Sequence, residues 1–357
     1  MTIYYISPTG NDANAGTSWS DAFLTIGKLL LAGSPLVGGD EVRVKTGVYR
    51  EVNTLGMTAL TSEVRFRADV DGSLGSGAAG PVRLTAFLTN DSTAPSASPV
   101  LTFNQRPFTT WEDIIFEGGN NVTTAACWQL AATTAGYAQR TRAKRCLFLC
   151  PDMAGGAGAL RAVDFHSQFG VDNLSSFEDC WFDGMPGFNS GHLFIGLVSG
   201  AAPSDYTCGI TVTGCRSIGN FVRVGLDGAA LAFFGGGVAI DDCKVLNGAA
   251  VNVGASISTT IPCTINNSIL MSAGGAALSA NALGQLTEDT NDIWSVTPRT
   301  NVTAGGSSTA NTKSRYAPLS DFVSDYQSFL NQITGTSASG GSAVDSLAGS
   351  LAGSLAR

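Results

Sequence analysis

Trp111-Glu112-Asp113-Ile114-Ile115-Phe116-Glu117-Gly118 is matched almost position for position by Phe177-Glu178-Asp179-Cys180-Trp181-Phe182-Asp183-Gly184. The same frame fits five further segments: Lys144-Arg145-Cys146-Leu147-Phe148, Thr213-Gly214-Cys215-Arg216-Ser217, Asp241-Asp242-Cys243-Lys244-Val245, Asn266-Asn267-Ser268-Ile269-Leu270 and Asn291-Asp292-Ile293-Trp294-Ser295. A polar turn followed by a short strand therefore recurs along most of the chain.

The spacing of these segments indicates a solenoid. The register residues are Ile114, Cys146, Cys180, Cys215, Cys243, Ser268 and Ile293, separated by 32, 34, 35, 28, 25 and 25 residues. One such repeat is too short to bury its apolar face, whereas stacked repeats share a core. We therefore predict an all-β fold, a right-handed parallel β-helix. Period-two alternation turns the register residue and the residue two places on inward. The Asp or Asn before the strand suits a left-handed turn.

The chain has eight cysteines and two histidines, which limits the metal sites and disulfides that it can form. There is no Cys-x-x-Cys motif and no histidine cluster, so we expect no metal site and no cofactor. The cysteines at positions 146, 180, 215 and 243 are predicted to stack as reduced thiols in the core. We expect the same of Cys127, Cys150, Cys208 and Cys263, with disulfides or metal ligation as the alternatives.

The beginning of the chain carries a motif of its own. Tyr4-Tyr5-Ile6-Ser7-Pro8-Thr9-Gly10-Asn11-Asp12 leads through Gly16-Thr17-Ser18-Trp19 to Gly39-Asp40-Glu41-Val42-Arg43-Val44-Lys45-Thr46-Gly47-Val48-Tyr49-Arg50-Glu51. This pattern resembles the opening module of the pectin-lyase-like β-helix superfamily. The resemblance is close over about the first 50 residues and rests on repeat periodicity afterwards.

Helical segments are predicted at both ends of the rod. Ser20 is a candidate N-cap for a helix that closes the open end, with Ala22, Phe23, Ile26, Leu29 and Leu30 as its apolar face. Residues 319–333 show helical spacing of apolar residues. We divide the chain into an opening module (1–52), coils (53–297), a C-terminal cap with a helix (298–335) and a flexible or partner-docking tail (336–357).

Composition and charge narrow the classes of partner. The formal net charge is −8, the charged residues make up 13% of the chain, and no run of Lys or Arg exceeds a pair. A nucleic-acid partner, which needs a basic face, is therefore not expected. No apolar stretch is long enough to span a membrane. The N-terminus has no pattern of a Sec-type signal peptide, which favours a virion or extracellular surface location reached without one.

Large apolar residues occupy outward positions of the predicted strands. The row beside the register residues reads Ile115, Leu147, Trp181, Arg216, Lys244, Ile269 and Trp294, and the row two places on reads Glu117, Leu149, Asp183, Ile218, Leu246, Met271 and Val296. Such rows need a cover, which is either loops and the C-terminal helix of the same chain or a neighbouring rod. The candidate subunit contacts are Ile115, Leu147, Ile269, Trp294 and the tail leucines Leu347, Leu351 and Leu355.

An exposed Trp181 beside Asp183 could alternatively stack on a sugar, with Glu178 and Asp179 completing a candidate glycan site. The superfamily resemblance implies polysaccharide lyase or glycosidase activity. Lyases of this kind combine Ca²⁺-binding aspartates with an Arg or Lys base, and no residues here match that set one by one. The acidic pairs fall mostly at turn positions. We name no catalytic residues.

Three functions follow as hypotheses. The first is a non-enzymatic structural or receptor-binding component of a phage particle, of the spike or decoration type. It would form a homo-oligomer, with a trimer as one arrangement, or contact other virion proteins and a surface glycan. The second is a polysaccharide lyase or glycoside hydrolase, and the third is a secreted surface adhesin.

Overall fold

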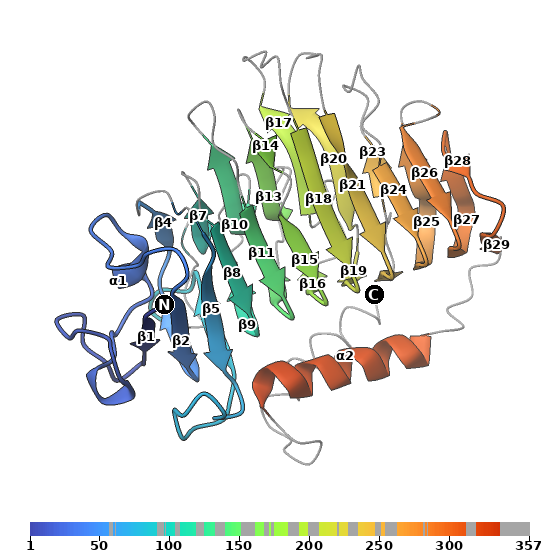
Figure 1. Cartoon of the computed structure of the whole chain (residues 1–357). Helices are drawn as coiled ribbons and strands as arrows, with labels where there is room; N and C mark the ends of the chain where they lie inside the picture. Colours follow the sequence, from blue (N-terminus) through green and yellow to red (C-terminus); the bar gives the residue numbers. More distant parts are fainter. Residues whose placement is uncertain are drawn as a thin grey trace.

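The computed structural model describes the part of the chain that carries the rod and one long helix. The described residues are 1–56, 60, 62–90, 96, 98–103, 108–118, 125–132, 140–150, 161–167, 171–172, 175–184, 193–198, 207–219, 221–227, 235–246, 251–253, 263–280, 283, 285–311 and 319–335. All strand pairings recorded between them are parallel, and the chain winds as a right-handed parallel β-helix (Figure 1). The predicted fold is confirmed.

Three rows of strands form the walls of the rod. The first is a 12-stranded sheet, here called sheet A. Its strands are β1 (Ile3–Ile6), β2 (Glu41–Lys45), β5 (Val64–Asp69), β8 (Phe108–Glu112), β11 (Arg140–Lys144), β14 (Val171–Asp172), β15 (Ser176–Glu178), β18 (Thr207–Thr213), β21 (Gly235–Asp241), β24 (Cys263–Asn266), β26 (Leu286–Asp289) and β28 (Thr303–Ala304).

The other two rows belong to one 17-stranded sheet, because the long strands β25 and β27 join them. Row B1 contains β3 (Gly47–Arg50), β6 (Val82–Thr85), β9 (Ile114–Glu117), β12 (Leu147–Cys150), β16 (Trp181–Gly184), β19 (Arg216–Ile218), β22 (Lys244–Leu246), β25 (Ile269–Ala280), β27 (Asp292–Thr300) and β29 (Thr309–Asn311). Row B2 contains β4 (Asn53–Leu55), β7 (Leu101–Phe103), β10 (Ala125–Ala132), β13 (Arg161–Ser167), β17 (Leu193–Val198), β20 (Val222–Asp227) and β23 (Val251–Val253), and meets β25.

The corner between sheet A and row B1 has the left-handed geometry that the sequence predicts. One residue with positive φ stands at this corner in seven successive coils: Asp113, Arg145, Asp179, Gly214, Asp242, Asn267 and Thr290. The residue that follows points into the core. At four of these positions it is a cysteine, which is small enough for the tight corner and can donate from Sγ to a nearby carbonyl oxygen, as Cys180 does to Glu178 at 3.3 Å.

The cysteine prediction is confirmed for six residues. The cysteines at positions 127, 146, 180, 215, 243 and 263 are buried and belong to no disulfide. Burial raises the pKa of the Cys146, Cys180 and Cys215 thiols, so they remain protonated. Nothing is described of the side chains of Cys150 and Cys208.

The predicted register is wrong at its last coil. Leu270 pairs with Ile293 and Ile269 pairs with Asp292, so the neighbour of Ser268 is Asn291 rather than Ile293. Trp294 consequently lies beside Met271, in the second outward row. A shift of two residues leaves every side chain on the same face of a strand, so apolar alternation cannot exclude it.

The helix predicted at the N-terminal end is also wrong in extent. The segment forms a short 3-10 helix, η1 (Trp19–Asp21), and one turn of α-helix, α1 (Gly27–Leu30). Ser20 does not cap α1; the Glu51 carboxylate accepts the N–H groups of Ile26 and Gly27 at 2.9 and 2.8 Å. The five apolar residues of the predicted helix face are nevertheless buried. Phe23 forms a bridge with Ile6 and so covers the free edge of β1.

The C-terminal helix predicted over residues 319–333 is present, and it lies along the rod (Figure 1). Helix α2 (Leu319–Thr334) runs beside the stacked strands (Figure 1). Its residues Phe322, Tyr326, Phe329, Leu330 and Ile333 form a second apolar cluster with the outward side chains of row B1. No helix of the described chain is long and apolar enough to cross a membrane.

Candidate functional site

Charged side chains gather on the outer face of sheet A. Strand β5 reads Val64-Arg65-Phe66-Arg67-Ala68, in which Phe66 is buried while Arg65 and Arg67 project outward. Phe66 stacks on Trp111 of β8 with 4.0 Å between ring centroids, so the strand is held from inside by its aromatic residue. This alternation places two guanidinium groups on the same outer surface.

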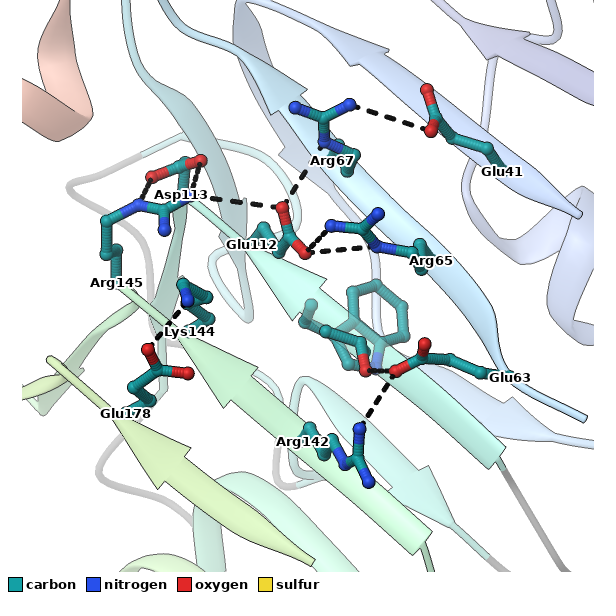
Figure 2. A network of polar contacts seen from close by, with 12 residues as sticks. Glu41, Glu63, Arg65, Arg67, Glu112, Asp113, Arg142, Lys144, Arg145 and Glu178 are labelled. Atoms are coloured by element: carbon teal, nitrogen blue, oxygen red, sulfur yellow. Dashed lines mark hydrogen bonds and ion pairs between the residues drawn. The ribbon is translucent and has the colours of Figure 1, made fainter. Parts of the chain in front are cut away.

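The register of the parallel strands aligns the outward polar residues of neighbouring strands in rows across sheet A. Arg65 pairs with Thr110, which pairs with Arg142. Arg67 pairs with Glu112, then Lys144 and then Glu178. Because neighbouring strands lie about 4.8 Å apart, side chains in such a row contact one another. Figure 2 shows the resulting network of arginine, lysine and carboxylate groups.

These residues surround a groove of about 420 Å³, here called the sheet A groove. Five cations and three carboxylates are among its lining residues: Arg65, Arg67, Arg142, Lys144, Arg145, Glu63, Glu112 and Glu178. The lining thus has an excess of two positive charges. The residues around this lining carry charges of both signs, among them Arg43, Glu41, Asp113 and Asp179, in a chain whose net charge is −8.

Glu112 holds the arginines of the groove in place. Its carboxylate lies 2.5 Å from Arg65 Nη2, 3.3 Å from Arg67 Nε and 3.8 Å from Arg145 Nη2. Arg145 also forms two hydrogen bonds with the Asp113 carboxylate, at 2.7 and 2.8 Å. A hydrogen bond with Glu112 raises the pKa of Arg65, and one with Asp113 raises that of Arg145. Both guanidinium groups therefore stay charged and are oriented before any ligand arrives.

Two further ion pairs border the groove. Lys144 Nζ lies 2.6 Å from Glu178, and Arg142 Nη1 lies 3.5 Å from Glu63. The Glu178 side chain is 48% exposed and the Lys144 side chain is 34% exposed, so water screens their attraction strongly. An anionic ligand can therefore compete for Lys144 at little energetic cost.

A second cavity adjoins the groove at the end of α2. This α2 pocket has a volume of about 460 Å³, and its lining includes Asp71, Asp113, Asn331 and Gln332. Arg67 and Arg145 line both cavities. The two spaces therefore share these two arginines as lining residues.

The structure separates the four residues predicted to bind a glycan. Glu178 lines the sheet A groove, and Asp179 is the left-handed residue at the corner beside it. Trp181 and Asp183 lie on row B1 with exposed fractions of 3% and 4%. Helix α2 covers both, so they do not form the exposed sugar-binding pair that we predicted.

The same helix covers the predicted subunit contacts. Ile115 and Leu147 are buried in the cluster under α2, and the partly buried Ile269 and Trp294 pack against it. The apolar rows are therefore covered by the chain's own helix, one of the two alternatives given by the sequence. Leu347, Leu351 and Leu355 lie outside the described residues.

Apart from Glu178, the charged residues of the groove were not predicted, because their cations alternate with uncharged residues instead of forming a run. A test for period-two alternation of Arg and Lys would have found β5 and Arg140-Thr141-Arg142-Ala143-Lys144 in β11. Within the described part of the chain, no group of three or more His, Cys, Asp or Glu residues is arranged to hold a metal ion.

Asp183 gives α2 docking a pH dependence. Burial raises the pKa of Asp183 from its ordinary value to about 6, and the Tyr326 hydroxyl donates to this carboxyl at 3.0 Å. The protonated form is favoured in the folded state, so this stabilisation is complete below the ordinary carboxyl pKa of about 3.9 and is lost as the pH rises through about 6. We expect about 2–3 kcal/mol between these limits.

Hydrogen exchange of the α2 amides at pH 5 and pH 8, corrected for intrinsic rates, measures this effect. Asp183→Asn keeps the acceptor for Tyr326 without the titration, so its α2 protection should not change between these pH values. An equal pH dependence in the wild type and this variant would exclude Asp183 as its source.

Comparison with known proteins supports the fold of this chain but does not identify its function. No protein-family model matches the sequence, and no curated protein matches it. A solved rhamnogalacturonan lyase superposes with a TM-score of 0.55 and 16% sequence identity, over 82% of this chain and 74% of that one. The pectate lyase Pel9A gives a TM-score of 0.46 and 13% identity, over 89% and 79% of the two chains. The superposition on the rhamnogalacturonan lyase supports the parallel β-helix fold alone.

Proposed function

We propose that this protein is a receptor-binding rod that holds an acidic polysaccharide in the sheet A groove. The observation that carries this proposal is the excess of cations among the groove residues of a strongly acidic chain. A negatively charged polymer is repelled by most of such a surface and attracted by the groove. Electrostatic complementarity of this kind selects both the ligand and its position.

The state of the arginines favours binding over catalysis. A general base must lose its proton near neutral pH, and enzymes achieve this for a lysine by lowering its pKa. The raised pKa values of Arg65 and Arg145 have the opposite effect. Permanently charged, planar guanidinium groups suit bidentate contacts with a carboxylate or sulfate.

The shared fold supports a saccharide as the anion. The rhamnogalacturonan lyase that superposes on this chain acts, by its name, on a polysaccharide. A long flat wall of parallel strands offers an extended polymer repeated contacts. We therefore favour an acidic polysaccharide over other polyanions, and a nucleic acid serves as a comparison ligand in the experiment.

Affinity electrophoresis in gels that contain polygalacturonate, alginate or neutral dextran tests the proposal. We expect the two acidic polymers to retard the protein and dextran to leave its mobility unchanged, with weaker retardation at higher salt. Arg65→Gln should weaken binding about tenfold, since one charge-assisted hydrogen bond is removed. The Arg65 side chain is 45% exposed, so this change should leave the fold intact.

Lys28→Gln is the matched control. Lys28 is exposed on α1, outside the residues that line the groove, and the substitution removes the same unit of charge. Equal losses in the two variants would mean that overall charge, rather than the groove, controls binding. Retardation by single-stranded DNA but not by the acidic polysaccharides would assign the groove to a different ligand.

A polysaccharide lyase or glycoside hydrolase on the same fold is the alternative function. Incubation of the retarded polymers with the protein distinguishes the two. Both a lyase and a hydrolase create new reducing ends, whereas only a lyase also creates unsaturated uronate ends that absorb ultraviolet light. Chain shortening that Arg65→Gln abolishes would replace the receptor-binding proposal by an enzymatic one.

We also propose that the rod is a spike or decoration component of a phage particle, located on the virion or at an extracellular surface. The buried, reduced cysteines among the described residues suit folding in a reducing compartment. Labelled antibodies on phage particles should then mark a defined position, and unlabelled particles would count against this assignment. The homo-oligomer remains a prediction, which light scattering of the purified chain tests directly.

A further inference from the structure

The two cavities differ in the chemistry of their walls. The α2 pocket has two arginines balanced by Asp71 and Asp113, so it lacks the cation excess of the sheet A groove. The amide side chains of Asn331 and Gln332 also line it. Amides donate and accept hydrogen bonds, and carboxylates accept them, which suits the hydroxyl groups of an uncharged sugar. An acidic sugar would meet Asp71 and Asp113.

The position of the two shared arginines makes the cavities neighbours along one path. Arg145 stands at the corner between sheet A and row B1, and Asp113 stands at the same corner one coil earlier. Arg145 lines both cavities and Asp113 lines the α2 pocket, so this hydrogen-bonded pair, which is drawn in Figure 2, stands where the two cavities adjoin. A ligand that leaves the groove beside Arg67 and Arg145 therefore enters the α2 pocket.

We propose that the α2 pocket is a second subsite, which binds a neutral sugar unit of the polysaccharide whose acidic unit lies in the sheet A groove. This inference rests on the proposed function. It assigns the ligand to heteropolysaccharides in which acidic and neutral units are adjacent. It also gives α2 a role beyond covering row B1, since Asn331 and Gln332 form a wall of the site.

Gly335 fixes the position of that wall. It follows α2 with a φ of +65°, and a Cβ atom there would lie 1.7 Å from the carbonyl oxygen of Val70 and 3.2 Å from the backbone nitrogen of Gly80. No side chain fits between these backbone atoms. Gly335→Ala must therefore move the end of α2 away from the loop that follows β5, which displaces Asn331 and Gln332 without altering either arginine.

Isothermal titration with two probes tests the subsite. The first is digalacturonate, and the second is the same disaccharide extended by two neutral galactose units. We expect the wild type to bind the extended probe about tenfold more tightly, from one or two additional hydrogen bonds and the contact area around them. Asn331→Ala combined with Gln332→Ala, and separately Gly335→Ala, should abolish this gain and leave the affinity for digalacturonate unchanged.

Ser328→Ala is the control, because Ser328 is exposed on α2 and lines neither cavity. Thermal unfolding of each variant verifies that it is folded. Equal affinities of the wild type for both probes, or a gain that survives in the Asn331/Gln332 double variant, would overturn the subsite while leaving the groove intact. If neither probe binds, the proposed function and the subsite are both wrong.

Discussion

Replacing Trp181 by alanine is expected to lower the free energy of unfolding by about 3–5 kcal/mol, the usual cost of truncating a buried tryptophan. Trp181 is 3% exposed, and the centroid of its ring lies 4.5 Å from that of Tyr326, 5.2 Å from that of Phe322 and 5.6 Å from that of Phe329. Three aromatic residues of α2 therefore lose their partner on row B1. If α2 detaches, the cost is limited to the free energy of docking that helix.

Urea unfolding measures the loss of global stability, and hydrogen exchange of residues 319–334 measures the detachment of α2. Trp181→Phe retains most of the aromatic contact and should lose much less stability. Leu283→Ala changes a side chain that is 72% exposed and should alter stability by less than about 0.5 kcal/mol. Unchanged exchange of α2 in the Trp181→Ala variant would show that α2 does not rest on this residue.

A comparable loss is expected when the buried ion pair of β13 is broken. Arg161 Nη1 lies 3.0 Å from the Asp164 carboxylate, and their side chains are 2% and 0% exposed. Asp164→Ala leaves a guanidinium group buried without this carboxylate, which costs about 3–5 kcal/mol in comparable cases. Chemical denaturation of the variant measures the loss of stability.

Replacing both charges distinguishes the pair from simple packing. Arg161→Met combined with Asp164→Leu removes the buried charges together, and such replacements are often neutral or stabilising. The exposed pair of Lys144 and Glu178 supplies a control, because Glu178→Ala should cost less than about 1 kcal/mol. A double variant less stable than Asp164→Ala would mean that the charges themselves are needed for this coil to form.

The repeat could be predicted because its causes are local. A left-handed residue, a small inward residue and an alternating strand follow one another within about six positions, so each coil carries its own signal. The register of the last coil was predicted wrongly because Asn291 and Ile293 both point inward. The alternation of apolar residues alone does not distinguish between these two positions. The N-terminal helix was overestimated because its cap is Glu51, which lies later in the chain, between β3 and β4.

The candidate site depends on contacts between distant segments. Glu112 meets Arg65 across 47 residues of sequence, and Arg145 meets Asp113 across 32. Only the alignment of successive coils, which unequal loops obscure in the sequence, brings these charges into one groove. The one predicted glycan residue that lines this groove, Glu178, had been chosen for its neighbours Trp181 and Asp183, which face α2 instead.

The sequence by itself determined the parallel β-helix, its inward cysteines and its left-handed corners, since strand alternation and backbone geometry act over a few residues. Only the tertiary structure decided which outward face is open and which is closed. Tyr326 reaches Asp183 from 143 residues away, and the apolar outward side chains of row B1 indicate that a cover is needed without specifying that α2 provides it. The free surface of the rod is set by where α2 docks, which is a property of the whole folded chain.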